Sequence, residues 1–278
     1  MNKIVGNSHH KDFFKFYEEK IIHIEKVYEV LMGKVAGCIF RNIIANDICS
    51  KITDNFWKSP SLKQRSDNVP AFYVGAYHYE KELSAYLAQA HCSNKSLPYL
   101  FSNTTNIFDE FISSLAIYLE SRGITLRLAE HENKKAGHFL MRSWSNSGSY
   151  ALKPHEDLAQ CGSLKQKDFE IQRVRDYEVV AVNMCLENGE DGNLHYWNIQ
   201  PNNLTRKRLG IEETGYPYPE NLLEDFQKII LPIKKGDIYC FNGRNIHAVD
   251  ELNQANRNRL TLSFLMGFIN SKTVVYWT

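Results

Sequence analysis

Several familiar sequence features are missing from this chain of 278 residues. Its six cysteines form no CxxC pair and have no regular spacing, which argues against a disulfide framework and against a structural zinc site. No apolar stretch is long enough to span a membrane, and the N-terminal residues lack the apolar centre of a signal peptide. We therefore expect a cytoplasmic protein with no membrane partner.

A strong excess of charge of either sign is also missing. The 33 basic residues nearly balance the 32 acidic ones, which gives a net charge of +1, and no long basic run occurs. Nucleic acid is therefore not an expected partner. Hydrophobic residues make up 43% and aromatic residues 12%, as in folded rather than disordered chains. Since no repeat or low-complexity linker divides the sequence, we expect a single domain over residues 1–278.

The spacing of apolar residues predicts helices in the N-terminal part, about residues 1–123. In three stretches apolar side chains recur every three or four positions, as on a helix with one buried face. Asn46 or Asp47 is a suitable N-cap for the second helix, and Gly123 is a natural stop for the third. The predicted helices cover 13–31, 46–56 and 107–119, with a short strand at 37–40.

Beyond Gly123 the pattern changes to short strands separated by Gly, Asn and Asp turns. Many short strands of this kind predict a β-rich α+β fold, with a double-stranded β-helix (a cupin-like jelly roll) over about 124–278 and the N-terminal helices packed against it. The predicted strands are 124–129, 137–143, 150–155, 178–186, 194–199, 228–233, 237–241, 260–268 and 273–277.

The segment 200–227 differs in texture from the rest of this part. It mixes charged residues with Tyr216-Pro217-Tyr218-Pro219 and has little strand periodicity. A long connection in a compact domain is often a lid or a binding loop. A solvated excursion without a role is an equally good interpretation, so both remain open.

Two histidines and a carboxylate carry the main chemical signal. His155 and Asp157 are two residues apart, and a strand places residues i and i+2 on the same face. His247 follows after a turn-strand-turn segment that can carry it to the opposite sheet. Two imidazoles and one carboxylate occupy one face of Fe(II) in non-haem oxygenases and leave positions for a cosubstrate and O2. We therefore expect these three residues to be the metal ligands and the catalytic centre.

Arg259 and Thr261 follow His247 in an apolar, strand-like run. A guanidinium can hold a carboxylate through two parallel hydrogen bonds, so this pair is expected to bind the distal carboxylate of 2-oxoglutarate as cosubstrate. Asn183 alternates with apolar residues in a predicted strand and is a further candidate for the same cosubstrate. In the alternative interpretation, His155 is a surface residue, His247 a satisfied core histidine and Arg259 a salt-bridge partner.

These motifs resemble those of the Fe(II)/2-oxoglutarate-dependent oxygenases. Within that group the chain is most similar to the stand-alone aliphatic halogenases and hydroxylases that act on indole alkaloids. The resemblance implies a jelly-roll fold that uses Fe(II), 2-oxoglutarate and O2. It is carried by Gly37-Cys38-Ile39-Phe40-Arg41, Asn46-Asp47, His155 to Asp157, the run from Gly236 to Gly243, His247, Arg259-Leu260-Thr261 and Val275-Tyr276-Trp277.

One departure from the halogenases determines the implied chemistry. Halogenases of this family have Gly or Ala where Asp157 stands, because a halide takes that coordination position. With the carboxylate retained, the resemblance implies hydroxylation of a small molecule, with release of succinate and CO2. The aromatic stretch 72–79 resembles a substrate-facing segment of these enzymes, so Phe72 and Tyr77 are substrate candidates. Leu152, close to the first metal ligand, is a third.

Three classes of function therefore remain. The favoured one is a hydroxylase of an unactivated C–H bond in an amino acid or a natural-product intermediate. An open groove would instead favour a hydroxylase of peptide or protein side chains. A non-catalytic, cupin-like metal-binding protein is the third, although Arg259 and Thr261 argue against it because it needs no clamp for a dicarboxylate. Substrate identity and oligomeric state are left open.

Overall fold

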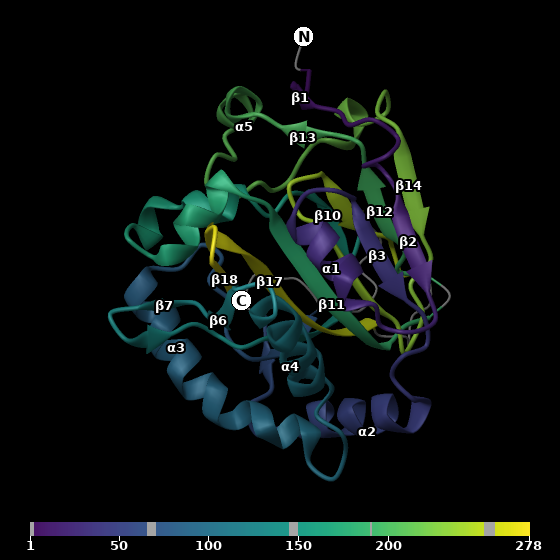
Figure 1. Ribbon diagram of the computed structural model, residues 1–278, viewed down its shortest axis with the longest axis vertical. Helices are drawn as coiled ribbons and strands as arrows, with labels where there is room; N and C mark the ends of the chain where they lie inside the picture. Colours follow the sequence, from purple (N-terminus) through teal and green to yellow (C-terminus); the bar gives the residue numbers. More distant parts are fainter. Residues whose placement is uncertain (1–2, 66–70, 145–149, 190, 253–258) are drawn as a thin grey trace.

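The computed structural model describes residues 3–65, 71–144, 150–189, 191–252 and 259–278. In this part of the chain a large sheet lies against a smaller one, and helices cover the outer face of the large sheet (Figure 1). No helix within these ranges is long and apolar enough to cross a membrane. The expected combination of many strands with packing helices is therefore confirmed as a mixed α/β architecture.

The large sheet has ten strands among the described residues. Its central strand β11 is rich in valine and separates two environments by simple alternation. Val180, Val182 and Met184 pack in the core beneath the helices, whereas Ala181 and Asn183 face the other way. The strand order of the large sheet is β2 (Phe16–Glu19), β3 (Gly37–Phe40), β15 (Ile238–Asn242), β11 (Val179–Glu187), β17 (Arg259–Asn270), β9 (Leu140–Trp144), β5 (Ala71–Val74) and β4 (Lys63–Gln64). In addition, β18 (Thr273–Trp277) pairs with the C-terminal half of β17, and β6 (Thr125–Leu128) pairs in parallel with β18.

The smaller sheet is antiparallel and contains both histidines of the predicted metal site, His155 and His247. The chain leaves the large sheet at the end of β15 and enters the smaller one at His247, so the turn between them carries that histidine across, as predicted. The strand order is β10 (Leu152–His155), β16 (His247–Val249), β12 (Leu194–Trp197) and β14 (Lys228–Leu231). Short pairs join β1 (Gly6–Asn7) to β13 (Gln200–Pro201) and β7 (Glu130–His131) to β8 (Lys134–Lys135).

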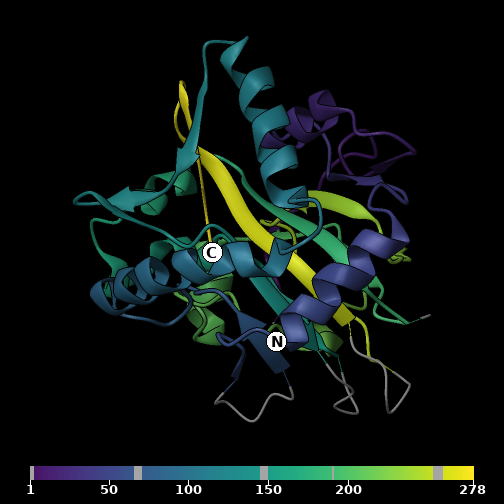
Figure 2. The same cartoon turned by 90° about the horizontal axis from the view of Figure 1, so that it is seen from below.

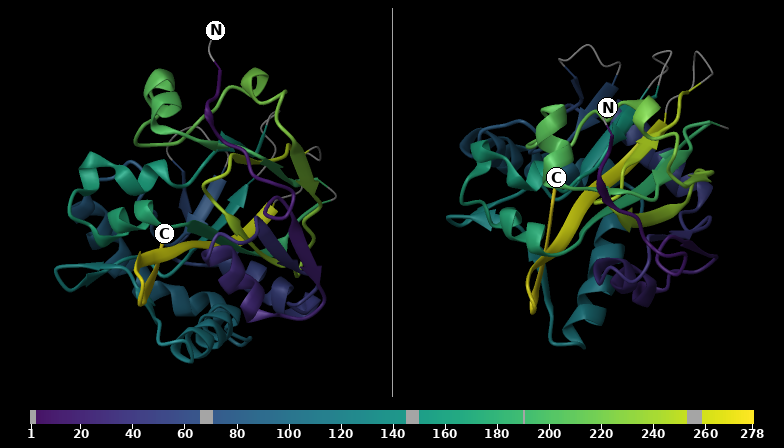
Figure 3. Two further views of the ribbon diagram at one scale, coloured as in Figure 1. Left: turned by 45° about the horizontal axis from the view of Figure 1, so that its top comes forward. Right: turned by 90° about the horizontal axis from the view of Figure 1, so that it is seen from above.

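Helices α1 to α4 bury apolar side chains in one continuous core with the outer face of the large sheet. Figure 2 shows α2, α3 and α4 lying across the strands, and Figure 3 shows α5 at the opposite end of the molecule from α4. The helices are α1 (Ile24–Leu31), α2 (Asn46–Trp57), α3 (Leu83–Ser96), α4 (Ile107–Glu120) and α5 (Asn203–Leu209), with 3-10 turns η1 (Leu97–Phe101), η2 (Ala159–Gly162), η3 (Leu164–Gln166), η4 (Glu170–Asp176) and η5 (Glu220–Leu222).

The N-terminal part is less helical than the apolar spacing predicted. The prediction of a helix over 13–31 was wrong in its first half, because 16–19 form a strand that pairs in parallel with β3 and only 24–31 are helical. Strands β2 to β5 all precede Gly123 and belong to the large sheet, so residues 1–123 are not a separate helical layer. Helix α2 begins where expected, but its N-cap residue is Ala45, which makes no side-chain cap.

Candidate active site

The three predicted metal ligands lie together where β10 ends and β16 begins. His155 is the last residue of β10, and its antiparallel partner is His247, the first residue of β16. Asp157 lies two residues beyond the end of β10. One ligand atom from each side chain lies within 4.8 Å of the other two. The structure thus assembles residues that are some ninety positions apart in the sequence.

Backbone carbonyl groups orient both imidazole rings. Nδ1 of His155 donates to the carbonyl oxygen of Lys153 at 2.8 Å, and Nδ1 of His247 donates to that of Asn245 at 2.9 Å. These hydrogen bonds fix the tautomer and leave each Nε2 as an acceptor. Burial lowers the pKa of His155 to about 3 and the pKa of His247 to about 4. Both rings are therefore neutral at pH 7 and can offer a lone pair to a metal ion.

The carboxylate of Asp157 is held between fixed neighbours with one oxygen unused. Its backbone N–H donates to the carbonyl of Gly243 at 2.7 Å, and a Cβ at Gly243 would come within 2.5 Å of Oδ2, so only glycine allows this approach. Oδ1 accepts from Gln160 at 3.0 Å. Oδ2 is buried, has no hydrogen-bond partner in the part of the chain that the structure describes, and lies 3.5 Å from Nε2 of His247. Burial raises the pKa of Asp157 to about 6.

These observations match the donor set of a mononuclear Fe(II) site. A buried carboxylate oxygen without a partner is costly unless something positive completes its environment. Here the unused oxygen stands beside two neutral imidazole nitrogens, and no other cluster of His, Cys, Asp and Glu with metal-binding geometry occurs within the described ranges. Two imidazoles with one carboxylate are the ligands of non-haem iron oxygenases.

Glu156, between the two ligands of the HxD motif, anchors their loop. Its carboxylate is fully buried, accepts two backbone N–H groups of the following turn, and pairs with Nε of Arg206 on α5 at 2.8 Å. Gly215 fits so closely that a Cβ there would lie 2.5 Å from the Glu156 carbonyl. The segment 200–227 is therefore tied to the metal-binding loop, while its role as a lid stays a prediction.

A pocket of about 780 Å³ opens between the two sheets and is lined by all three predicted ligand residues. This volume is within the usual range for sites that enclose a small molecule. Its wall includes Thr214 and Tyr216 from the 200–227 segment. Three predicted contact residues, Leu152, Asn183 and Tyr77, also line it.

Phe72, the third of the predicted substrate contacts, was placed on the wrong side. Successive residues of a strand point to opposite faces, and on β5 it is Tyr73 that lines the pocket. The ring of Phe72 instead packs edge-on against Trp57 of α2, with 5.6 Å between the ring centroids. Phe72 therefore belongs to the core beneath the helices.

Arg259 and Thr261 line the same pocket from β17, across from the smaller sheet. Both are buried, and their spacing of two places them on one face of the strand. The guanidinium of Arg259 donates through Nη2 to the hydroxyl of Tyr239, while Nε is buried and has no partner among the described residues. A buried guanidinium with unused donors is suited to bind a carboxylate.

Sequence analysis did not identify several residues of the pocket wall. Tyr239 orients Arg259, and Gln160 orients Asp157, as described above. Arg142 and Trp144 lie two positions apart on β9, and both face the pocket. The alternation of Arg142 and Trp144 within a predicted strand was a usable signal, but it could not tell which face of the strand was buried against the site.

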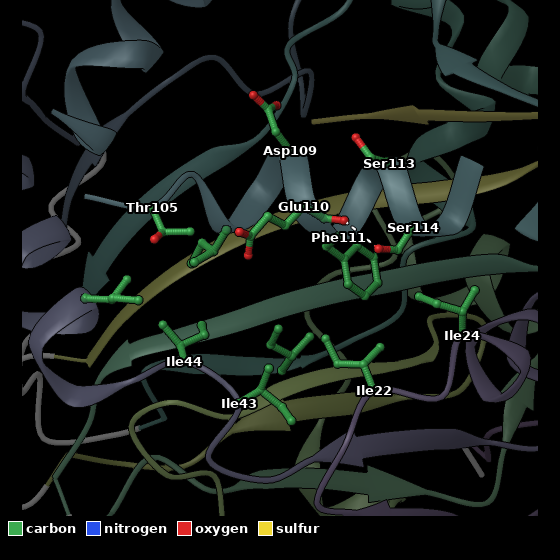
Figure 4. A pocket seen from close by; sticks show the side chains of 13 residues that line it. Ile22, Ile24, Ile43, Ile44, Thr105, Asp109, Glu110, Phe111, Ser113 and Ser114 are labelled. Carbon is green, nitrogen blue, oxygen red and sulfur yellow. Dashed lines mark hydrogen bonds between the residues drawn. The ribbon is translucent and has the colours of Figure 1, made fainter. Parts of the chain in front are cut away.

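A second cavity lies on the outer side of the large sheet. It is lined by apolar residues of the N-terminal segments and by α4 (Figure 4). Its acidic residues, Asp109 and Glu110, are exposed positions of α4, and its described wall contains no histidine, cysteine, lysine or arginine. The groups suited to chemistry therefore lie in the pocket between the sheets.

Comparisons with known proteins identify the family of the chain. The family model described as "Carrier-protein-independent halogenase WelO5" matches residues 12–278. An L-isoleucine 3(1)-dioxygenase from Pantoea ananatis (strain AJ13355) is 32% identical over 249 residues, which cover 86% of this chain and 82% of that protein.

Solved structures share the fold at much lower identity. An N-substituted L-amino acid dioxygenase from Burkholderia ambifaria AMMD has a TM-score of 0.61 at 13% identity, covering 92% of this chain and 91% of that one. The same enzyme in complex with alpha-KG has a TM-score of 0.54 at 13% identity and the same coverage.

With this fold and this ligand set, the chain is an oxygenase that depends on Fe(II), 2-oxoglutarate and O2. More narrowly, it belongs to the family of carrier-protein-independent halogenase WelO5, because that model spans nearly the whole chain. It acts on a small molecule.

Proposed function

We propose that His155, Asp157 and His247 hold one Fe(II) between the two sheets, which form a jelly roll. The observation that carries this proposal is the unpartnered Oδ2 of Asp157 beside two neutral, oriented imidazoles. Bound Fe(II), with 2-oxoglutarate and O2, supplies the oxidant that puts one oxygen atom into a C–H bond while the cosubstrate leaves as succinate and CO2. The protein's part is to position the substrate and to exclude water.

The cosubstrate binds with its distal carboxylate on Arg259 and Thr261. The unused Nε and the donors of the guanidinium fork give two parallel hydrogen bonds to a carboxylate, and the hydroxyl of Thr261 adds a third. The hydroxyl of Tyr239 accepts a hydrogen bond from Nη2 and so fixes the orientation of the Arg259 guanidinium. Asn183 lies on the same inner face and donates to the cosubstrate from β11.

The product is hydroxylated and not halogenated, although the family takes its name from halogenases. Asp157 is directed at the metal position by its loop, by Gly243 and by Gln160. A carboxylate there fills the coordination position that a halide needs.

The substrate is a free amino acid hydroxylated at an aliphatic carbon. The relative with 32% identity is named for L-isoleucine, and the pocket is bounded by both sheets and by the 200–227 segment. The volume of about 780 Å³ is of the size that a small molecule fills. A metal-binding protein without catalysis would have no need of buried, unpaired guanidinium donors opposite the metal position.

The test compares two histidines of the same sheet. His247→Ala removes an imidazole that no neighbour replaces, so bound iron and production of succinate should both be lost. His195→Ala is the control, because His195 lies on the adjacent strand next to Ala248 and does not line the pocket. Iron content is measured by elemental analysis of each purified variant. If His247→Ala retains iron and activity at the level of the control, the metal site is misassigned.

A further inference from the structure

A second arginine faces the pocket with a buried donor that has no partner among the described residues. Arg142 lies on β9, and its Nε is buried and makes no hydrogen bond within the described residues. Its cross-strand neighbours, Tyr73 on one side and Thr261 on the other, carry no charge. Leaving a guanidinium donor buried and unpaired is unfavourable, so this position is suited to an anion that arrives with a ligand.

The ring of Trp144 holds this guanidinium in a defined orientation. The Cζ atom of Arg142 lies 4.3 Å from the centroid of that ring, and the Cζ of Arg65 lies 5.8 Å from the same ring. A guanidinium that packs on an aromatic ring keeps its N–H edges available for a planar acceptor. Burial, followed by the charges of Arg65 and Arg259, lowers the pKa of Arg142 to about 9. The charge of Asp157 opposes this shift, but in the proposed scheme the metal ion takes up that charge.

The proposed scheme also leaves one positive group of the wall without an anion. In that scheme Arg259 is taken by 2-oxoglutarate and Asp157 by the metal ion. Arg142 lies on the same pocket wall, and the scheme assigns no anion to it.

We propose that Arg142 binds the carboxylate of the substrate, so that the enzyme selects carboxylic acids over their amides. This inference rests on the proposed function as an amino-acid hydroxylase and deepens it. Both carboxylates of 2-oxoglutarate already have partners in that scheme, one at Arg259 and one at the metal. Arg142 lines the same pocket as the predicted metal ligands His155 and Asp157. A substrate held there by its carboxylate extends its side chain along the wall that includes Leu152 and Val249.

The experiment measures binding separately for the cosubstrate and the substrate. Fe(II) and 2-oxoglutarate are titrated anaerobically into the protein and followed by their charge-transfer absorption band, and L-isoleucine or L-isoleucinamide is then added. The wild type should bind the acid at least about 30-fold more tightly than the amide, as expected for a charge-assisted, forked hydrogen bond. Arg142→Gln should remove this preference while it changes the Kd of 2-oxoglutarate by less than about threefold.

Two further variants make the result specific. Arg142→Lys keeps the charge but loses the fork, so it should recover part of the preference for the acid. Arg122→Gln is the matched control, because Arg122 also packs on aromatic rings, with Cζ at 4.7 Å from Tyr118, but lies outside the pocket. Far-UV circular dichroism confirms that each variant is folded, and the lysine variant carries the test if the glutamine variant is not.

Each alternative result has a distinct meaning. If Arg142→Gln weakens 2-oxoglutarate and leaves the preference for the acid intact, Arg142 serves the cosubstrate and the inference is wrong. If the wild type hydroxylates L-isoleucine and its amide equally well, the proposed function stands but the inference fails. If a panel of free amino acids gives no hydroxylated product and no shift of the absorption band, the proposed substrate class fails and the inference fails with it.

Discussion

Replacing Asp157 by asparagine should stabilise the metal-free protein while it abolishes metal binding. The carboxylate of Asp157 is buried, and burial raises its pKa from 3.8 to about 6. A shift of about two pKa units corresponds to roughly 3 kcal/mol of unfavourable free energy for the ionised form at pH 7. Asparagine carries no charge, its amide oxygen can still accept from Gln160, and its NH2 group can donate to Nε2 of His247.

The pH dependence of this effect has a definite sign. Because the folded-state pKa of Asp157 lies above the unfolded-state value, protonation of this carboxyl favours the folded state. The penalty should be absent below pH of about 4, grow between about 4 and 6, and be complete above about 6. The difference in the free energy of unfolding between Asp157→Asn and the wild type should follow the same course.

The assay is urea unfolding of both proteins with chelator, at several pH values between 4 and 8. At pH 7 the variant should be more stable by about 2 to 3 kcal/mol, with a Tm roughly 4 to 10 °C higher. Asp225→Asn, at an exposed position, is the control and should change little. Saturating Ni(II) should reverse the order, since only the wild type gains binding free energy. A variant less stable than the wild type at pH 7 without metal would refute the reasoning.

Two further predictions concern the cosubstrate and the metal-binding loop. Arg259→Gln should weaken 2-oxoglutarate by about 2 to 3 kcal/mol, measured by anaerobic titration of the absorption band, and unchanged affinity would contradict its role. Arg206→Gln breaks the buried ion pair with Glu156 and should lower the free energy of unfolding by on the order of 3 kcal/mol. The exposed neighbour change Lys207→Gln should lower it by less than about 0.5 kcal/mol in the same urea experiment, and equal losses would contradict the importance of the pair.

The grouping of His155, Asp157 and His247 was predictable because it follows from short-range rules. The spacing of His155 and Asp157 fixes a common side of the strand end, and the turn before His247 carries that residue into the other sheet. The same holds for Arg259 and Thr261, which share one strand face. A binding site whose side chains lie on one strand, or just beyond its end, can be predicted from the sequence when those side chains are typical ligands of one metal ion or one cosubstrate.

Other features were not predictable because they depend on long-range packing. Residues 16–19 match a helical spacing, yet they pair with β3 once that strand is present, so tertiary pairing overrides the local pattern. Helix α3 was missed because its buried face includes Ala90 and Ser93, which give little apolar signal. Phe72 was misplaced because a single step along a strand reverses the face.

The pocket residues Tyr239 and Arg142 were missed for a related reason. Each lies on a strand whose alternation was recognisable, but the buried inner face of a sheet and the outer face under helices are both apolar here. The register of β9 and β15 against their neighbours determines which side of each strand points toward the predicted metal site. A single sequence does not contain that register in any local pattern.

The most direct test of the account is the product made by the wild type in the presence of halide. Purified enzyme with Fe(II), 2-oxoglutarate, O2 and L-isoleucine is incubated in high chloride or bromide, and the products are analysed by mass spectrometry. If Asp157 closes the coordination position that a halide needs, the substrate gains one oxygen atom, succinate forms in equal amount and no halogen is incorporated. A halogenated product from the enzyme with Asp157 intact would contradict the assignment of Asp157 as an iron ligand.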